Sequence, residues 1–380
     1  MITRRNFGRT AMLAASATLL AITAFASGGA KAADFSGKRI TIIVPFSEGG
    51  GTDSYSRFMA PYFEKYLPGH PKIIVLNKPG GGGLTGVNYY ADRATKDGTM
   101  VLALSTSSQS NYMLGDPRAK FNMADFIPII LSPRGITCYT RNNLGIQNEK
   151  TLKAKIKKLA SYPPEKLSFG GKTPTSGGLA LRVALSLLGV EVNSVWGLGG
   201  NGPMALGFER GEFTVNYDNT LSFLNNRTYM IKTGVAVPLF TFGVVNEEGG
   251  IDRDPALPDV PTVPEFYKAV YGKAPSGPAY EAWRSLMAVS VPLSKSWNLM
   301  EGTPKDVVQA WREAAKKVYA EVIKEPAGKK IFGPYKNIIG DAAVPIRDQG
   351  TTLSPEAAKW LANYVKVRYN VTVKNAKIRK

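Results

Sequence analysis

The sequence predicts an α/β protein of about two domains, built on mostly parallel sheets flanked by helices. Apolar, β-branched runs alternate with segments of helical period along most of the chain, which is the pattern of strands connected by crossover helices. Two glycine-rich runs stand where a strand gives way to a helix. The chain has 380 residues, too many for one compact core.

The first elements form a βαβαβ unit. Apolar runs with flanking turn residues predict three strands, and amphipathic segments between them predict two helices. The strands are Arg39–Val44, Lys72–Asn77 and Thr99–Ser105, and the helices are Ser54–Tyr66 and Gly86–Ala94. Such a unit favours parallel pairing, with helices on both faces of the sheet.

A second region begins near Ile127 and continues the alternation. Its predicted helices are Thr151–Ala160, Ser176–Leu188 and Pro203–Glu209, and its predicted strands are Lys166–Gly170, Ser194–Trp196, Phe213–Tyr217 and Gly234–Phe242. The stretch Asp252–Pro264 is rich in Pro and Asp and predicts a loop. The remainder is expected to be mostly helical, with amphipathic helices at Tyr280–Ala288, Lys305–Ile323 and Ser354–Val367.

The N-terminal segment 1–32 has the pattern of a cleaved export signal. A basic start with the pair Arg4-Arg5 precedes an apolar run from Ala11 to Phe25, and Ala30-Lys31-Ala32 supplies a cleavage site. The arginine pair favours the twin-arginine (Tat) route, although Gly8 stands where that pattern usually has Leu. The alternative is an uncleaved anchor, which the short apolar run disfavours. The predicted location is the periplasm.

Composition excludes several kinds of site. The chain carries a formal charge of +19, which favours an anionic partner, and export argues against nucleic acid. A solvated lysine surface would explain the charge equally well. The single cysteine, Cys138, cannot form an intrachain disulfide, and we expect it to be buried and inert. With His70 as the only histidine and no G-x-S-x-G motif, we predict no catalytic residue and no metal ligand.

The first glycine loop reads PFSEGGGTD and runs from Pro45 to Asp53. Glycine lets backbone N–H groups approach a ligand with no Cβ in the way, and a helix N-terminus adds free donors and partial positive charge. Asp53 has two interpretations. It caps the helix, which we favour, or it contacts an amino or hydroxyl group of a ligand.

The second loop, NKPGGGGLTG from Asn77 to Gly86, follows the next strand. Since the carboxyl ends of parallel strands meet at one edge, both loops together predict a nest of amide donors for a carboxylate. Two alternatives remain. The loops are only tight turns, or Gly81-x-Gly83-x-x-Gly86 is a dinucleotide-binding fingerprint, a weak match because four consecutive glycines satisfy it easily.

These motifs, in order, resemble those of Bug-type (TctC-like) extracytoplasmic solute receptors of tripartite tricarboxylate transporters. The resemblance runs from Arg39 to Pro304, and its further markers are Lys96-Asp97-Gly98-Thr99, Asp125-Phe126-Ile127-Pro128, Asp259-Val260-Pro261-Thr262 and Gly302-Thr303-Pro304. It implies a two-domain periplasmic binding protein of the Venus-flytrap, type II-like fold. Such a receptor is a monomer that needs no cofactor and performs no catalysis. It closes on a di- or tricarboxylate, or an aromatic acid, and delivers it to transporter membrane subunits.

The resemblance also implies where the ligand and the domains lie. The predicted domains are 33–132, which carries both glycine loops, 133–240, and 241–380, which returns to the first domain and ends in helices. The predicted ligand-binding residues are Phe46, Ser47, Gly49, Gly50, Gly51, Thr52, Asp53, Gly80, Gly81, Gly82, Gly83, Ser105, Thr106, Ser107, Thr175, Ser176, Gly177, Tyr217 and Asp218.

Departures from the family pattern leave the ligand open. The stretch Trp196-Gly197-Leu198-Gly199-Gly200 replaces a Y-K-G-G-like segment, and Glu48 brings negative charge to the mouth of an anion site. Two other functions remain as alternatives. One is an exported nicotinamide-dependent enzyme that uses the same cleft, and the other is a solute sensor for a membrane signalling partner.

Overall fold

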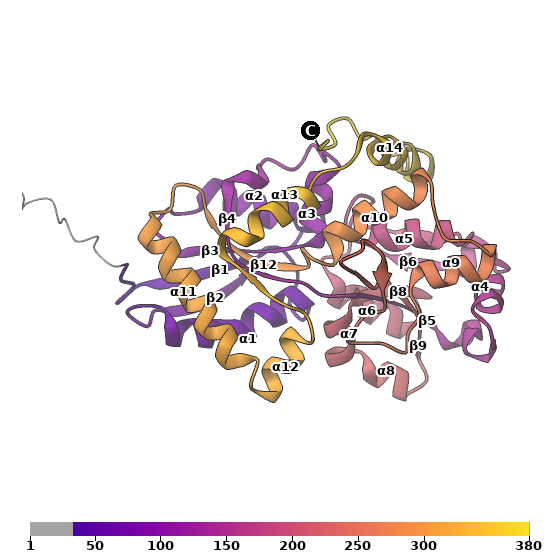
Figure 1. The fold of residues 1–380 in the computed structure, drawn as a ribbon, viewed down its shortest axis with the longest axis horizontal. Coiled ribbons are helices and arrows are strands. Elements are labelled where there is room, and N and C mark those ends of the chain that lie inside the picture. The colour runs from indigo at the N-terminus through magenta and orange to yellow at the C-terminus, as the bar shows by residue number, and fades with distance from the viewer. Residues whose placement is uncertain (1–32, 380) are drawn as a thin grey trace, which may run out of the picture.

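A computed structural model describes residues 33–379, which form two lobes side by side (Figure 1). The predicted signal peptide lies outside the described residues. Within residues 33–379, no helix combines the length and apolar character needed to cross a membrane.

The first lobe is built on a six-stranded mixed sheet with the order β13-β4-β12-β3-β1-β2. Its parallel part is the predicted βαβαβ unit, in which β1 pairs with β2 and with β3. The other three strands are antiparallel to their neighbours. The strands are β1 (Arg39–Val44), β2 (Lys72–Asn77), β3 (Met100–Ser105), β4 (Phe126–Ser132), β12 (Lys295–Met300) and β13 (Ile338–Ile339).

The helices of the first lobe cover this sheet around an aromatic core. They are α1 (Gly51–Tyr66), α2 (Leu84–Arg93), α3 (Thr106–Met113), α11 (Lys305–Val322), α12 (Pro326–Phe332) and α13 (Ala343–Gly350). Phe63 of α1 packs 4.8 Å from Trp297 of β12 and 5.4 Å from Trp311 of α11, centroid to centroid. All three side chains are fully buried, so this core holds α1 firmly against the sheet.

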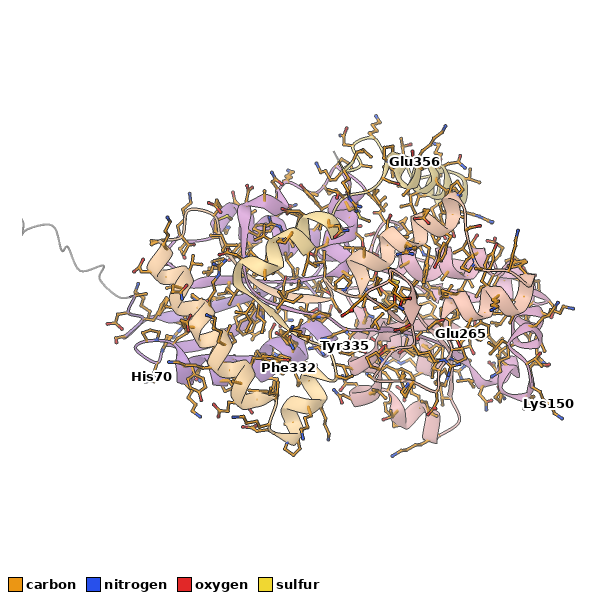
Figure 2. The ribbon with its side chains drawn as sticks, in the orientation of Figure 1. His70, Lys150, Glu265, Phe332, Tyr335 and Glu356 are labelled. Atoms are coloured by element: carbon orange, nitrogen blue, oxygen red, sulfur yellow. The ribbon has the colours of Figure 1, made fainter. Side chains whose placement is uncertain are left out.

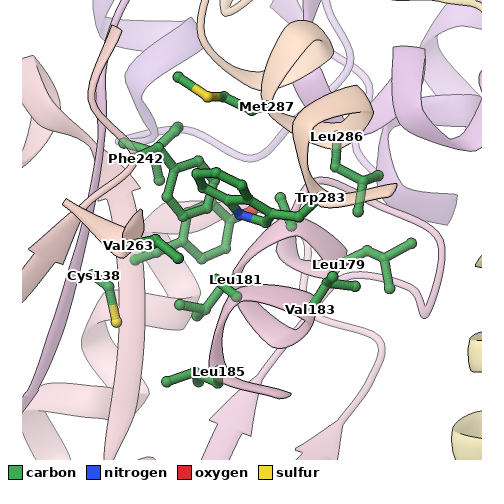
Figure 3. Packing of buried hydrophobic residues seen from close by; sticks show 14 of the residues in the cluster. Cys138, Leu179, Leu181, Val183, Leu185, Phe242, Val263, Trp283, Leu286 and Met287 are labelled. Atoms are coloured by element: carbon green, nitrogen blue, oxygen red, sulfur yellow. The ribbon is translucent and has the colours of Figure 1, made fainter. Parts of the chain in front are cut away.

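The second lobe contains a five-stranded mixed sheet with the order β7-β6-β8-β5-β9. The strands are β5 (Ile136–Arg141), β6 (Ser168–Gly170), β7 (Asn193–Val195), β8 (Val215–Asn219) and β9 (Ala236–Thr241). Its helices are α4 (Leu152–Ala160), α5 (Gly178–Leu187), α6 (Asn201–Arg210), α7 (Thr220–Asn226), α8 (Thr228–Lys232), α9 (Val263–Tyr271) and α10 (Pro278–Ser290). Figure 3 shows Trp283 of α10 packed on Phe242 among aliphatic side chains of α5. Cys138 is buried nearby, as expected.

The chain passes from the first sheet to the second through residues 133–135, after β4, and returns to the first sheet through residues 291–294, before β12. A buried network braces the first passage, where Asp254 fills the space beside Gly135 and accepts hydrogen bonds from Thr220 and Tyr335. Figure 2 labels Tyr335 where the two lobes meet. The predicted boundary at residue 132/133 falls at this passage. Helices α9 and α10, which follow the predicted boundary at 240/241, pack against α4 and α5 of the second lobe.

The C-terminal segment contacts both lobes. Helix α14 (Pro355–Tyr369) packs on α10, and Tyr364 donates a hydrogen bond to the Arg182 carbonyl of α5. The chain then returns to the first lobe, where the Lys377 N–H donates to the Met113 carbonyl at 2.8 Å. Ile378 forms an isolated bridge with Leu353.

The structure agrees with the predicted fold class and differs in detail. The sheets are mixed rather than mostly parallel, because strands that follow each passage between the lobes pair antiparallel. Strand β12 was predicted as part of a helical region, since its sequence KSWNLM lacks an apolar run. A small hairpin, β10 (Val244–Val245) with β11 (Ile251–Asp252), also went unpredicted. His70 lies in an exposed turn at the far edge of the first lobe (Figure 2).

Candidate functional site

A small cavity of about 40 Å³ lies between the two lobes. The first lobe contributes Phe46, Gly50, Gly51, Thr52, Ser105, Thr106, Ser107, Ser294 and Lys295, and the second contributes Ile136, Lys172, Asn201, Tyr217 and Asn219. Hydroxyl, amide and ammonium groups therefore converge on this space from both sides.

The N-terminus of α1 opens onto this cavity. The N-cap residue Gly50 has no side chain to satisfy the first helical donors, and the first backbone bond at this end runs from Ser54 N–H to the Gly50 carbonyl at 2.9 Å. The amides of Gly51 and Thr52 precede that bond and have no acceptor inside the helix. Unpaired donors and the helix dipole together make this end of α1 attractive to an anion.

Gly51 also allows the lobes to meet. A Cβ at this position would lie 2.3 Å from the Ser222 hydroxyl and 2.8 Å from the Asn219 side-chain nitrogen, both on the second lobe. Close to this point, the Ser47 N–H donates to the Gly199 carbonyl across the cleft at 3.2 Å. The described structure is therefore a closed form, in which backbone groups of the two lobes touch.

Asp53 stabilises the first glycine loop from inside. Its carboxylate accepts the Gly49 N–H at 3.0 Å, the Arg57 guanidinium at 2.9 Å and the Asn77 side-chain amide at 3.0 Å. Gly50 is the N-cap of α1, so the cap interpretation of Asp53 is wrong in position, although this carboxylate does accept a loop amide. It lies outside the cavity lining.

Lys172 reaches the cavity from the loop after β6. Its side chain is buried, and the ammonium donates to the Asn201 amide oxygen at 2.7 Å and to the Tyr217 hydroxyl at 3.4 Å. Burial lowers the pKa of Lys172 to about 8, and Asp218 opposes this shift. Burial, together with the charge of Asp218, raises the pKa of Tyr217, so this hydroxyl stays neutral.

Lys295 reaches the same cavity from the start of β12. Its ammonium donates to the Ser105 hydroxyl at 3.1 Å and to the Ser294 carbonyl at 3.0 Å. Burial lowers the pKa of Lys295 well below its ordinary value, and the positive charges of Arg134 and Lys172 lower it further. The pKa of Arg134 falls to about 10, mainly through burial. A positive field thus fills the centre of the closed molecule.

Asp218 only partly balances this field. Its carboxylate lies behind the cavity wall, where it accepts from the Tyr139 hydroxyl at 3.0 Å and the Asn201 amide at 3.1 Å. The Arg227 guanidinium lies 3.4 Å away. Burial raises the pKa of Asp218, which disfavours its charged form. The sequence predicted Asp218 as a ligand contact, and the structure places it as the support of Asn201.

The second glycine loop lies away from the cavity lining. Residues Gly81–Gly83 form one 3₁₀ turn, and all four glycines from Gly80 to Gly83 have positive φ. The side-chain amide of Asn111, on α3, donates to the carbonyls of Gly81 and Gly82. Its oxygen accepts the hydroxyls of Thr173 and Thr175 from the second lobe, at 3.1 and 2.8 Å. We call this set of contacts around Asn111 the latch.

The predicted residues thus divide into two groups. Eight line the cavity: Phe46, Gly50, Gly51, Thr52, Ser105, Thr106, Ser107 and Tyr217. The others lie beside it, in loop turns or interlobe contacts: Ser47, Gly49, Asp53, Gly80, Gly81, Gly82, Gly83, Thr175, Ser176, Gly177 and Asp218. Ser107 begins a helix rather than ending a strand, and its hydroxyl accepts the Gly177 N–H at 3.3 Å.

Six lining residues were missed by the sequence reasoning: Ile136, Lys172, Asn201, Asn219, Ser294 and Lys295. Lys172 lies between the predicted strand Lys166–Gly170 and the predicted helix Ser176–Leu188, and could have been selected there as the one cation of that connection. Lys295 offered no comparable signal, because its strand was not recognised.

Comparisons with known proteins agree with this architecture. No protein-family model matches the chain. A Pseudomonas sp. (strain P51) protein, described as a UPF0065 protein in the tcbD-tcbE intergenic region, is 25% identical over 349 residues. The match covers 88% of this chain and 90% of that one.

Three solved structures share the fold. A periplasmic transporter aligns with a TM-score of 0.65 at 21% identity, covering 89% of this chain and 99% of that one. Periplasmic binding protein BugD aligns with a TM-score of 0.61 at 21% identity, and the match covers 86% of this chain and 97% of that one. MatC (Rpa3494) from Rhodopseudomonas palustris, solved with bound malate, aligns with a TM-score of 0.62 at 19% identity, and the match covers 85% of this chain and 98% of that one.

The chain has the fold of the Bug and TctC periplasmic solute-binding proteins. The resemblance inferred from the glycine-loop motifs is therefore confirmed at the level of the fold. The matched structures are named as a periplasmic transporter, a periplasmic binding protein and a solute-binding protein.

Proposed function

We propose that this protein is a periplasmic receptor that captures a small organic carboxylate between its lobes. We further propose that it delivers the carboxylate to the membrane subunits of a tripartite tricarboxylate transporter. The observation that carries the proposal is the interlobe cavity, where the unpaired amides of α1 and the buried Lys172 and Lys295 converge. MatC, of the same fold, holds malate. An acid of this class would meet complementary charge and donors in this cavity.

Binding would act through closure of the lobes. A carboxylate seated at the start of α1 adds contacts to the second lobe that exist only when the lobes meet, so it raises the population of the closed form. The latch and the Ser47–Gly199 bond belong to that form. A transporter that recognises the closed surface would then distinguish loaded from empty receptor.

The alternative of a nicotinamide-dependent enzyme finds little support. A cavity of about 40 Å³ is far too small for a dinucleotide. The fingerprint glycines Gly81 and Gly83 belong to a turn packed beside the latch rather than to the cavity wall. A sensor for a membrane signalling partner would use the same binding step, so binding measurements alone do not separate it from a transport receptor.

The test is calorimetric titration of the purified protein with malate, citrate, benzoate and NAD⁺, supported by thermal melting. We expect at least one carboxylate to bind and to raise the melting temperature without being converted. Binding of NAD⁺ with no response to any carboxylate would overturn the proposal. Transport is tested separately, by uptake of the bound acid in cells with and without the receptor.

A further inference from the structure

We propose that Lys172 and Lys295 form a charge clamp, one ammonium from each lobe, which selects a ligand carrying two negative groups on a short carbon chain. The ligand class is a short dicarboxylate. This inference rests on the proposed function and deepens it, because it names the residues that determine specificity and the size of the acid.

The two lysines approach one cavity from opposite lobes. Lys172 extends from the second lobe and Lys295 from the first, and both line the same cavity. Each side chain is about 4% exposed. In the part of the chain that the structure describes, neither ammonium forms an ion pair, and their hydrogen-bond partners are neutral: Asn201, Met204 and Tyr217 for Lys172, and Ser105 and the Ser294 carbonyl for Lys295.

Among the residues that the structure describes, the two buried lysines lack a counter-charge of their own. A buried ammonium without a counter-charge is strongly disfavoured, and two of them near Arg134 repel one another. The nearest acid, Asp218, is already engaged by Arg227, Tyr139 and Asn201. A monocarboxylate would neutralise one lysine and leave the other unpaired. A dianion bridging the lobes would neutralise both, and only in the closed form.

The cavity is small, and part of its wall is apolar. Its volume is about 40 Å³, so a compact ligand suits it better than a long one. Phe46 and Ile136 place apolar surface between the polar groups, which suits a short hydrocarbon spacer.

The experiment compares ligands and variants by calorimetry at pH 7. The probes are oxalate, malonate, succinate, adipate, acetate and sulfate, titrated into the wild-type protein, Lys172→Met, Lys295→Met and the matched control Lys153→Met on the exposed face of α4. We expect one of the three short dicarboxylates to bind at least 100-fold more tightly than acetate or adipate. Each clamp variant should lose at least 100-fold in affinity for that acid, and the control should be unchanged.

Thermal melting distinguishes loss of the clamp from loss of the fold. Since each clamp variant removes an unpaired buried charge, its ligand-free form should melt at or above the wild-type temperature. If a methionine variant is unfolded, the glutamine variant at that position takes its place. An unaffected clamp variant would overturn the clamp, as would equally tight binding of acetate, adipate or sulfate, while the receptor function would stand. Binding of no carboxylate at all would overturn both.

Discussion

The two glycine loops have nearly the same composition and the same position after neighbouring strands, yet the structure uses them differently. In the first loop Gly50 and Gly51 line the cavity, and absence of a side chain at Gly51 lets the second lobe approach. In the second loop the four glycines adopt positive φ and form a turn whose carbonyls face Asn111. One loop leaves backbone donors free at the cavity, and the other offers acceptors to a protein side chain.

This difference shows that glycine content alone does not identify a ligand site. Both loops need glycine, but the first needs its small size and the second its backbone freedom. The distinguishing signal is the direction of the free backbone groups. A helix N-terminus presents N–H groups to an anion, whereas a tight turn satisfies several of its own, as in the Gly83 N–H bond to the Gly80 carbonyl at 2.9 Å.

Substituting Gly51 should give the largest effect. In Gly51→Val the new side chain would collide with Ser222 and Asn219 when the lobes close, so we expect ligand affinity to fall at least 100-fold with little change in melting temperature. The matched control is Ala327→Val, at an exposed position of α12 outside the cavity lining. Equal affinity of Gly51→Val and the control would contradict the role assigned to this loop.

Removing the latch should give a smaller effect. Asn111→Ala deletes two hydrogen bonds between the lobes and two to the second glycine loop, so the closed form loses about 1–2 kcal/mol relative to the open one. We expect affinity for every ligand to fall about tenfold, with selectivity among acids unchanged. A changed order of preference in titrations of this variant would place Asn111 in the ligand site instead.

A further effect, a loss of affinity of no more than about tenfold between pH 8 and pH 9, should come from pH and should separate the two loops again. Lys172 loses its proton above pH 8 in the ligand-free protein, whereas a bound anion favours the ammonium. Affinity should therefore decline as the pH rises above about 8. The facing groups include Lys295, Arg134, Asp218, Arg227 and Tyr217; burial lowers the pKa of Lys295 and raises that of Tyr217.

Stability of the ligand-free protein should show the opposite trend. The unfolded chain protonates Lys172 with a pKa of 10.5 and the folded one with a pKa of about 8, so the unfolded state binds more protons between these values. Stability contributed by this group therefore rises with pH across that window. Titrations and melting curves from pH 7 to 10 test both trends, and the fold loss in Asn111→Ala should stay constant across the range. Parallel trends in affinity and stability would contradict the assignment.

Much of the first lobe was predicted from the sequence, because its first strands and helices are neighbours both along the chain and in the sheet. Strands β1 and β2 were predicted to the residue, since apolar β-branched runs bounded by turns have few alternatives. Strand β12 was missed because the polar residues Ser296 and Asn298 alternate with Trp297 and Leu299, and its place in the sheet comes from pairing with β3 and β4. Non-local pairing of this kind leaves no periodic signal.

The residues that line the cavity show the same limit of prediction from sequence. The amides at the start of α1 follow from a local strand-loop-helix pattern, and Gly50, Gly51 and Thr52, which were predicted as ligand-binding residues, line the cavity. Lys295 reaches the cavity because a strand from far along the chain inserts beside β3. Its role depends on burial, which a polar sequence does not reveal.

The end of the chain limits how widely the molecule can open. Tyr369 rests against Trp196 on one half, and Lys377 is tied to Met113 on the other. The intervening peptide can lengthen to at most about 3.3–3.6 Å per residue before one attachment must break. In the proposed receptor, this C-terminal segment would limit how far the lobes separate to admit a solute, so changing its length is a direct way to alter the rate of capture.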